Sequence, residues 1–221
     1  MGQAPSDVVI PIVFPNYLIA VDTPPIDVDL HIHIPGLPTH VKIPPLHERV
    51  PYLGHAGAAF FDGRTGVTKY YEYGRYDPKA LGLVRHVAVP DIRVPPSAIG
   101  LLPLLKSISA RSGQHGPILG AYIQLPAGAY NKMLAYCNRR MAENANPRRA
   151  PYGLLSNTCC HFMSSVAVAG GVDMPAVIPP EPAGYIRVVR AFFPILDYAP
   201  LSTLSVPCLG SVAGAKGAGA Q

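Results

Sequence analysis

Tryptophan is absent from this chain of 221 residues, and charged residues make up only 14% of it. So small a charged fraction, beside 49% hydrophobic residues, excludes a disordered chain, because disorder needs high charge and few apolar side chains. Long apolar runs are lacking too. Residues 154–172 are nearly uncharged, but polar side chains such as Asn157 and His161 interrupt them, so we predict no transmembrane segment. The composition is that of a globular protein.

The N-terminus lacks the order of a signal peptide, in which a basic region precedes an apolar region and a cleavage site. We therefore expect a protein made in the cytoplasm that, if exported, leaves by a route that recognises no such signal. Cysteine is scarce as well. Cys137, Cys159, Cys160 and Cys208 show no Cys-x-x-Cys metal spacing, and a vicinal pair almost never bridges to itself. We expect free thiols.

Proline and glycine are abundant instead, with 26 and 21 residues. They exclude an all-helical bundle or a coiled coil, because proline breaks helices and glycine weakens them. Prolines crowd residues 1–51, where the alternating segment 27–34 and other short β-branched pieces are expected to form edge strands or extended segments. We interpret residues 1–51 as a Pro-rich extended arm packed on a main domain of residues 52–200, and the low-complexity residues 201–221 as a mobile tail.

Charge is unevenly divided along the chain. Residues 1–91 carry 7 Lys and Arg against 9 Asp and Glu, a net charge of −2, whereas residues 92–221 carry 11 against 4, a net charge of +7. A basic half suits an anionic polymer or membrane, or it has no dedicated partner. Because no run of Lys and Arg exceeds two residues, we predict no nucleic-acid partner.

The predicted elements are those of an α+β protein. An antiparallel meander is expected over residues 54–90, because turn residues at 62–66 and 77–82 separate three β-branched or aromatic segments. Helices are predicted from Ser97 to about 112, over 127–145, and from Asn157 or Thr158 to about 169. Further strands are predicted over 117–125 and 186–196.

The segment Ser156-Asn-Thr-Cys-Cys-His-Phe-Met163 holds a candidate nucleophile. If a helix begins here, Cys159 lies in its first turn, where free N–H groups and the helix dipole stabilise a thiolate and lower the thiol pKa. Cys160 points about 100° away on an ideal helix, so only one of the two can face a common site. The alternative is a buried, inert cysteine pair that packs as small hydrophobic side chains.

A thiolate hydrolase also needs a base, and the meander offers two polar candidates. His55 begins its first strand among small residues, which leave room for a helix end. Glu72 lies in the next strand among aromatics, where a carboxylate needs a partner such as an imidazole, unless it lies on the solvent face. His161 lies across the helix from Cys159 and is not expected to be its base.

His31 and His33 are spaced to chelate a metal from one face of a strand, but no third ligand lies nearby. Alternation alone explains the pair, and we predict neither a metal nor a cofactor. The remaining histidines, apart from those named above, are expected to be ordinary surface or core residues.

The stretch Tyr152-Gly-Leu-Leu-Ser-Asn-Thr-Cys-Cys-His-Phe162 resembles the Tyr-x-Leu-Leu-x-Asn-x-Cys-x-His-Phe motif of the lecithin:retinol acyltransferase-like proteins. These form the circularly permuted branch of the NlpC/P60 papain-like superfamily, in which the His strand precedes the Cys helix. Here His55-Ala-Gly57 matches the His-x-Gly strand of that branch. The resemblance, over residues 52–170, implies a permuted papain-like α+β fold whose antiparallel sheet carries the His and packs against the Cys helix.

The resemblance also implies a catalytic triad. Cys159 would be the nucleophile and His55 its base, and Glu72 falls where the third, polar member is expected to orient the imidazole. Further candidates for stabilising the oxyanion or lining the site are Tyr152, Asn157 and Tyr71.

More narrowly, residues 54–57 and 69–77 resemble NlpC/P60-like toxins delivered by type VI secretion. Such a toxin implies an immunity protein, a secretion machine and action in the periplasm or envelope of a target cell. The expected activity is that of a cysteine amidase or peptidase that cleaves stem-peptide amides of peptidoglycan. An acyl hydrolase or acyltransferase acting on an anionic lipid with the same triad is the alternative, and a catalytically inactive binding module is the second alternative.

Overall fold

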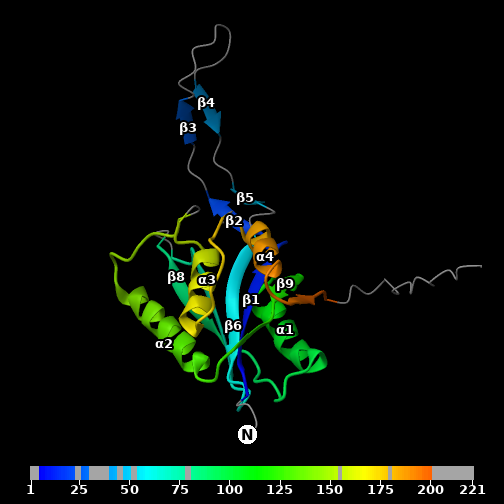
Figure 1. Ribbon diagram of the computed structural model, residues 1–221. Coiled ribbons are helices and arrows are strands. Elements are labelled where there is room, and N and C mark those ends of the chain that lie inside the picture. Colours follow the sequence, from blue (N-terminus) through cyan, green and yellow to red (C-terminus); the bar gives the residue numbers. More distant parts are fainter. Residues whose placement is uncertain are drawn as a thin grey trace, which may run out of the picture.

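The computed structural model describes residues 5–22, 26–29, 40–43, 47–50, 54–77, 81–153, 156–178 and 181–200. In these residues, antiparallel strands form a seven-stranded sheet with helices on both faces (Figure 1). The strand order is β11-β9-β1-β6-β7-β8, and β10 also pairs with β1. The α+β class that the sequence predicts is thus confirmed, whereas the predicted tail, 201–221, lies outside the described residues.

The sheet consists of β1 (Asp7–Phe14), β6 (His55–Phe61), β7 (Thr68–Gly74), β8 (Leu83–Val87), β9 (Ile118–Ala121), β10 (Ile123–Leu125) and β11 (Ile195–Tyr198). The predicted meander is β6, β7 and β8. Asp62 closes its first turn, because Asp62 Oδ1 accepts the N–H groups of Arg64 and Thr65 at 2.8 and 2.9 Å. Two separate ladders pair β2 (Ile19–Asp22) with β5 (His47–Val50) and β3 (Ile26–Asp29) with β4 (His40–Ile43).

β1 lies at the centre of the sheet, so the interpretation of residues 1–51 as an arm limited to edge strands is wrong for this strand. It pairs with β6 on one side and with β9 and β10 on the other, and it is buried along its whole length. Pro11 has no N–H to donate, but it lies at the gap between β9 and β10. There Tyr122 donates its N–H to Pro194 O, at 2.8 Å, rather than to β1.

In the described residues, four α-helices flank the sheet: α1 (Ala98–Ser112), α2 (Ala129–Ala142, followed by a 3-10 turn over Glu143–Ala145), α3 (Cys159–Gly170) and α4 (Pro182–Arg190). None of them has both the length and the hydropathy needed to span a bilayer. The predicted helix signals are confirmed for α1, which Ser97 caps, and for α3, which ends at Gly171 with a φ of 101°.

The strand predicted over 186–196 is wrong in its first half, where α4 forms instead. Glu181 accepts the N–H groups of Ala183 and Gly184 at 2.9 and 2.7 Å, and Pro182 occupies the start of the helix. A carboxylate cap followed by proline is a strong helix start, because proline at that position has no N–H that needs a partner. Only β11 remains of the predicted strand.

The position of α3 is set by the sheet beneath it. Alternate residues of β1 divide between two apolar cores, one under α1 and the other under α2, α3 and α4. The end of α3 at Gly170 lies against Leu125, which pairs with Asp7 at the beginning of β1. Its first residue therefore lies toward the opposite end of β1, where Phe14 pairs with His55.

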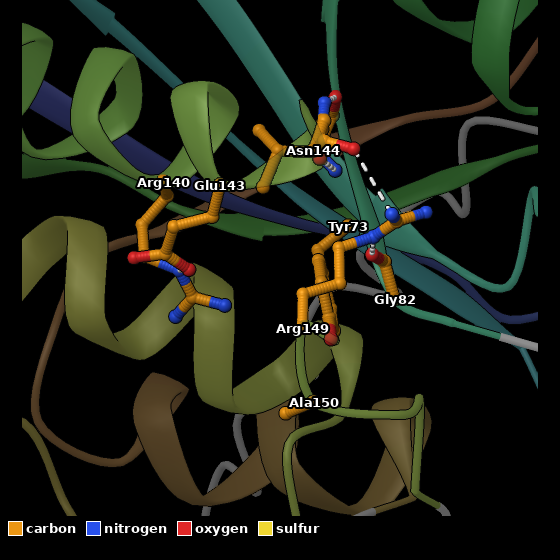
Figure 2. A pocket seen from close by; sticks show the side chains of 8 residues that line it. Tyr73, Gly82, Arg140, Glu143, Asn144, Arg149 and Ala150 are labelled. Atoms are coloured by element: carbon orange, nitrogen blue, oxygen red, sulfur yellow. Dashed lines mark hydrogen bonds and ion pairs between the residues drawn. The ribbon is translucent and has the colours of Figure 1, made fainter. Parts of the chain in front are cut away.

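Arg149 anchors the loop that leads into α3 (Figure 2). Its guanidinium donates to Gly82 O at 2.7 Å and to Asn144 O at 2.9 Å, and it forms an ion pair with Asp77. The neighbouring Arg140 lies 3.0 Å from a Glu143 carboxylate oxygen. Arg140 and Arg149 line a small pocket, and each has a carboxylate partner. The hydrogen bonds of Arg149 stabilise the loop.

Asp7 joins three parts of the fold although it is only 4% exposed. One carboxylate oxygen accepts the N–H of Gly63 at 3.0 Å, in the turn between β6 and β7. The other accepts the N–H of Tyr130 at 2.9 Å, in the first turn of α2, where Gly128 supplies no side-chain cap. Asp7 thus serves as a remote cap for α2.

Replacing Asp7 by Ala is expected to lower the free energy of unfolding by about 2–3 kcal/mol, because two buried N–H groups lose a charged acceptor. Asp7→Asn should lose less, since its amide oxygen still accepts one of the two hydrogen bonds. Equilibrium unfolding in urea measures both losses. Equal stability of Asp7→Ala and the wild type would contradict this role.

Candidate active site

Cys159 is the first residue of α3, as the sequence predicts. Thr158 precedes it as the cap: its hydroxyl accepts the N–H of His161 at 3.3 Å, and His161 Nδ1 in turn lies 3.4 Å from the N of Thr158. This capping box uses a ring nitrogen of His161 for the helix start. Cys159 therefore lies at the positive end of the helix dipole, which favours a thiolate.

Tyr152 is the nearest polar neighbour of Cys159. Its hydroxyl oxygen lies 3.4 Å from Cys159 Sγ and also 3.4 Å from the backbone N of Cys159. The hydroxyl donates to the sulfur and accepts from the N–H. Tyr152, a predicted lining residue, thus lies beside Cys159.

Asn157 and Tyr71, the other two predicted lining residues, have different positions. Asn157 shapes the loop before α3: its φ is 57°, and its side-chain amide donates to the Tyr73 hydroxyl at 2.7 Å. Tyr71 follows the alternation of β7 away from Glu72, stacks on Phe60 and donates to Asn138 in α2 at 3.1 Å. The placement of Tyr71 in the site is therefore corrected.

His55 is 6% exposed and is held on one side of its ring. Its Nε2 lies 3.3 Å from Glu72 Oε2 and 2.8 Å from the hydroxyl of Tyr76. Tyr17 covers the ring at a centroid distance of 5.1 Å. Because Nε2 already has these two partners, Nδ1 is the ring nitrogen left to act on Cys159, which is among the groups that raise the pKa of His55.

Glu72 is 2% exposed, and cations and hydroxyls surround its carboxylate. Tyr70 donates to Oε2 at 3.3 Å, and Arg85 Nε lies 3.6 Å from Oε1. Gly57 makes room for this contact, since a Cβ there would lie 2.4 Å from the Tyr70 hydroxyl. Burial raises the pKa of Glu72, but the hydrogen bond to His55 and the charges of His55 and Arg85 outweigh it, so the pKa is lowered.

The thiol and the imidazole shift each other's pKa values in opposite directions. A hydrogen bond from Cys160 and the hydrogen bond and charge of His55 lower the pKa of Cys159 well below 9.0, against the effect of burial. Burial lowers the pKa of His55, but hydrogen bonds to Cys159 and Glu72 and their charges outweigh it and raise the pKa from 6.5 to about 9. Both directions favour the charged forms, a thiolate on Cys159 and an imidazolium on His55.

Cys160 differs sharply from its neighbour. Its hydrogen bond to Cys159 and its burial raise the pKa of the Cys160 thiol. Cys137, Cys159 and Cys160 are all free and buried, so the prediction of free thiols is confirmed for these three, whereas Cys208 lies outside the described residues. Of the vicinal pair, Cys159 is thus the acidic thiol.

The sequence analysis missed Tyr76 and Tyr70. Positions 70, 72, 74 and 76 alternate along β7 and just beyond it, so their side chains share one side of the strand. That period would have placed both tyrosines beside Glu72. As for a metal, the part of the chain that the structure describes holds no group of three His, Cys, Asp or Glu that could bind one, and His31 and His33 lie outside it.

Comparison with known proteins gives a consistent set of matches. The family profile described as type VI secretion system effector TseH-like matches residues 9–174, which include His55 and Cys159. Among solved structures, the chain is similar to the crystal structure of the type VI secretion system effector TseH, with 33% sequence identity and a TM-score of 0.68. That similarity covers 89% of this chain and 94% of the other. No curated protein matches the chain.

We expect iodoacetamide to reveal Cys159 as the most acidic thiol. The dependence of the alkylation rate on pH gives the pKa of each thiol separately from its access to the reagent. Followed by peptide mass spectrometry, the rate for Cys159 should reach its plateau well below pH 9, whereas Cys137, whose pKa burial raises to about 12, should not. His55→Ala should move the Cys159 inflection upward. An inflection near 9 in the wild type would contradict the thiolate–imidazolium pair.

Proposed function

Because the chain belongs to the TseH-like family of type VI secretion system effectors, we propose that it is a secreted cysteine hydrolase with Cys159 as its nucleophile. The observation that carries this proposal is the acidic thiol at the start of α3, whose pKa is lowered by a buried imidazole, while Glu72 and Tyr76 hold Nε2 of that imidazole. Nucleophile, base and orienting carboxylate are the parts that thiol-dependent acyl transfer requires.

In the proposed reaction, the Cys159 thiolate attacks the carbonyl carbon of the substrate and forms a tetrahedral intermediate. The backbone N–H of Cys159 and the hydroxyl of Tyr152 donate hydrogen bonds to its oxyanion, a role that the position of the hydroxyl, 3.4 Å from both Sγ and N, supports. The His55 imidazolium gives its proton to the leaving amine as the carbon–nitrogen bond breaks.

The second half of the reaction frees the enzyme. The remaining acyl group is a thioester on Cys159, and His55 is now neutral. It takes a proton from water as the water oxygen attacks the thioester carbon, and the carbon–sulfur bond then breaks. The thiolate and the imidazolium are restored, and the substrate leaves as a carboxylic acid. Glu72 keeps its negative charge throughout and stabilises the imidazolium.

The proposed architecture is a circularly permuted papain-like domain. The order of the catalytic elements supports it, since β6, which carries His55, precedes α3, which carries Cys159. The antiparallel sheet of β6, β7 and β8 packed against the Cys helix also supports it. The family match extends back to residue 9, so the proposed domain includes β1 as well as residues 52–200.

We propose stem-peptide amides of peptidoglycan as the substrate, cleaved in the periplasm or envelope of a target cell. Membership of a secreted effector family and the basic balance of residues 92–221 support an anionic wall substrate. A producing cell would then need an immunity protein as well as the secretion machinery. Lipid acyl chemistry is the second candidate, because residues 152–162 resemble the acyltransferase motif. A purely binding module is disfavoured by the acidic thiol.

Purified sacculi and phospholipid vesicles distinguish the two substrates. Wild-type protein should release muropeptide fragments from sacculi and no fatty acid from vesicles; the reverse would establish the lipid candidate. Cys159→Ala should abolish turnover. Cys160→Ala should keep measurable turnover, reduced because the thiolate loses one hydrogen-bond donor. Loss of all turnover in a folded Cys160→Ala protein would contradict the assignment of the nucleophile.

The pH profile of muropeptide release should fall above about pH 9, where the His55 imidazolium loses the proton that the leaving amine needs. Glu72→Gln removes a negative charge that raises the pKa of His55, so this alkaline fall should move to lower pH. Glu143→Gln is the matched control, since Glu143 pairs with Arg140 at 3.0 Å. A profile that Glu72→Gln leaves in place would exclude Glu72 from orienting His55.

A further inference from the structure

The shorter of the two contacts at His55 Nε2 is made by a tyrosine rather than by the carboxylate. Nε2 lies 2.8 Å from the Tyr76 hydroxyl and 3.3 Å from Glu72 Oε2. A ring nitrogen carries at most one hydrogen, and a hydrogen bond of 2.8 Å is much stronger than one of 3.3 Å. The imidazolium N–H therefore donates mainly to the tyrosine oxygen.

The Tyr76 hydroxyl and Glu72 Oε2 are neighbours of the same ring nitrogen, His55 Nε2, and the charge of Glu72 acts on the tyrosine. Burial and the charge of Glu72 raise the pKa of Tyr76, so its hydroxyl stays protonated and has a hydrogen to donate to the carboxylate. A hydroxyl can accept one hydrogen bond while it donates another. Donation from His55 Nε2 to Tyr76, and from Tyr76 to Glu72, would satisfy all three groups.

We propose that Tyr76 is a positioning residue of this site, whose hydroxyl bridges the His55 imidazole and the Glu72 carboxylate and fixes Nδ1 toward Cys159. This inference rests on the proposed function. It makes the orienting group of the imidazole a tyrosine–carboxylate pair in place of a carboxylate alone.

The surroundings hold the Tyr76 ring in the bridging position. The ring meets His55 edge-on, with an interplanar angle of 81° and a centroid distance of 6.1 Å. The Arg85 guanidinium lies 4.5 Å above the ring centroid, while Arg85 Nε is 3.6 Å from Glu72 Oε1. Arg85 therefore packs on the Tyr76 ring and also pairs with the Glu72 carboxylate. It keeps the tyrosine and the carboxylate next to each other.

Gly74 gives the ring its space. A Cβ at Gly74 would lie 2.8 Å from two carbons of the Tyr76 ring and 3.1 Å from its hydroxyl. Any larger residue would push the ring away from His55. One side of β7 and of the residues just after it thus presents the carboxylate of Glu72, the space left by Gly74 and the hydroxyl of Tyr76.

Loss of the hydroxyl should make the charged form of His55 less stable and, as a result, the thiolate form of Cys159 less stable too. In Tyr76→Phe the ring, its edge contact with His55 and its contact with Arg85 remain, but Nε2 keeps only the 3.3 Å contact to Glu72. The pKa of His55 should fall and that of Cys159 should rise, because each charge stabilises the other.

The test is the pH dependence of iodoacetamide alkylation at Cys159, measured by peptide mass spectrometry on the full chain. Tyr76→Phe should move the Cys159 inflection upward by about one pH unit, so that alkylation below the inflection slows about tenfold. Gly74→Ala should shift it in the same direction, and the double variant should add little, because both changes remove one interaction.

Tyr71→Phe is the matched control. Tyr71 also lies in β7 and also loses a hydroxyl hydrogen bond, to Asn138 at 3.1 Å, but on the other face of the strand. It should leave the Cys159 inflection in place. Suppose that the Cys159 inflection is well below 9 in the wild type and is the same in Tyr76→Phe and in Gly74→Ala. The bridge is then refuted and the proposed function stands. A wild type with an ordinary thiol pKa would refute both.

Discussion

The proposed electrostatic pairing of Cys159 with His55 brings together the start of α3 and the start of β6. A thiolate or an imidazolium alone would be unstable there, since both side chains are almost fully buried. Each becomes favourable because the other is charged, which the opposite shifts of their pKa values express. The pairing requires the first turn of α3 to meet the first residue of β6, and much of the fold serves that meeting.

Several features bring the two elements together. β1 extends the sheet so that its end, at Phe14, pairs with His55. The capping box of Thr158 and His161 fixes where α3 begins, and Arg149 anchors the loop before it. On the far side of the imidazole, buried hydroxyls and Arg85 keep Glu72 charged, so that this buried carboxylate has partners of its own.

Much of this could be predicted from the sequence where the signal is local. Ser97, Thr158 and the terminal glycines mark helix ends through their own side chains or backbone freedom, and those helices were predicted at nearly their observed bounds. His55, Glu72 and Cys159 stand out because each is polar or reactive in an apolar setting. The pattern also indicated a sheet next to a helix, although not how their ends meet.

What could not be predicted depends on contacts between distant segments. β1 contains Pro11, which suggests an edge strand, and only the gap between β9 and β10 makes a central position possible. Alternation along β7 separates Tyr71 from Tyr76, but packing between distant segments decides which side of the strand faces α2 and which faces His55. In both cases tertiary pairing overrides a residue's local preference.

Titration of the His55 imidazole by NMR, in the wild type and in Cys159→Ala, tests the central claim most directly. The paired charges predict a pKa of about 9 for His55 in the wild type and a clearly lower one in Cys159→Ala, where the hydrogen bond and negative charge of the thiolate are gone. A single pKa near 6.5 in both proteins would show that no thiolate–imidazolium pair exists.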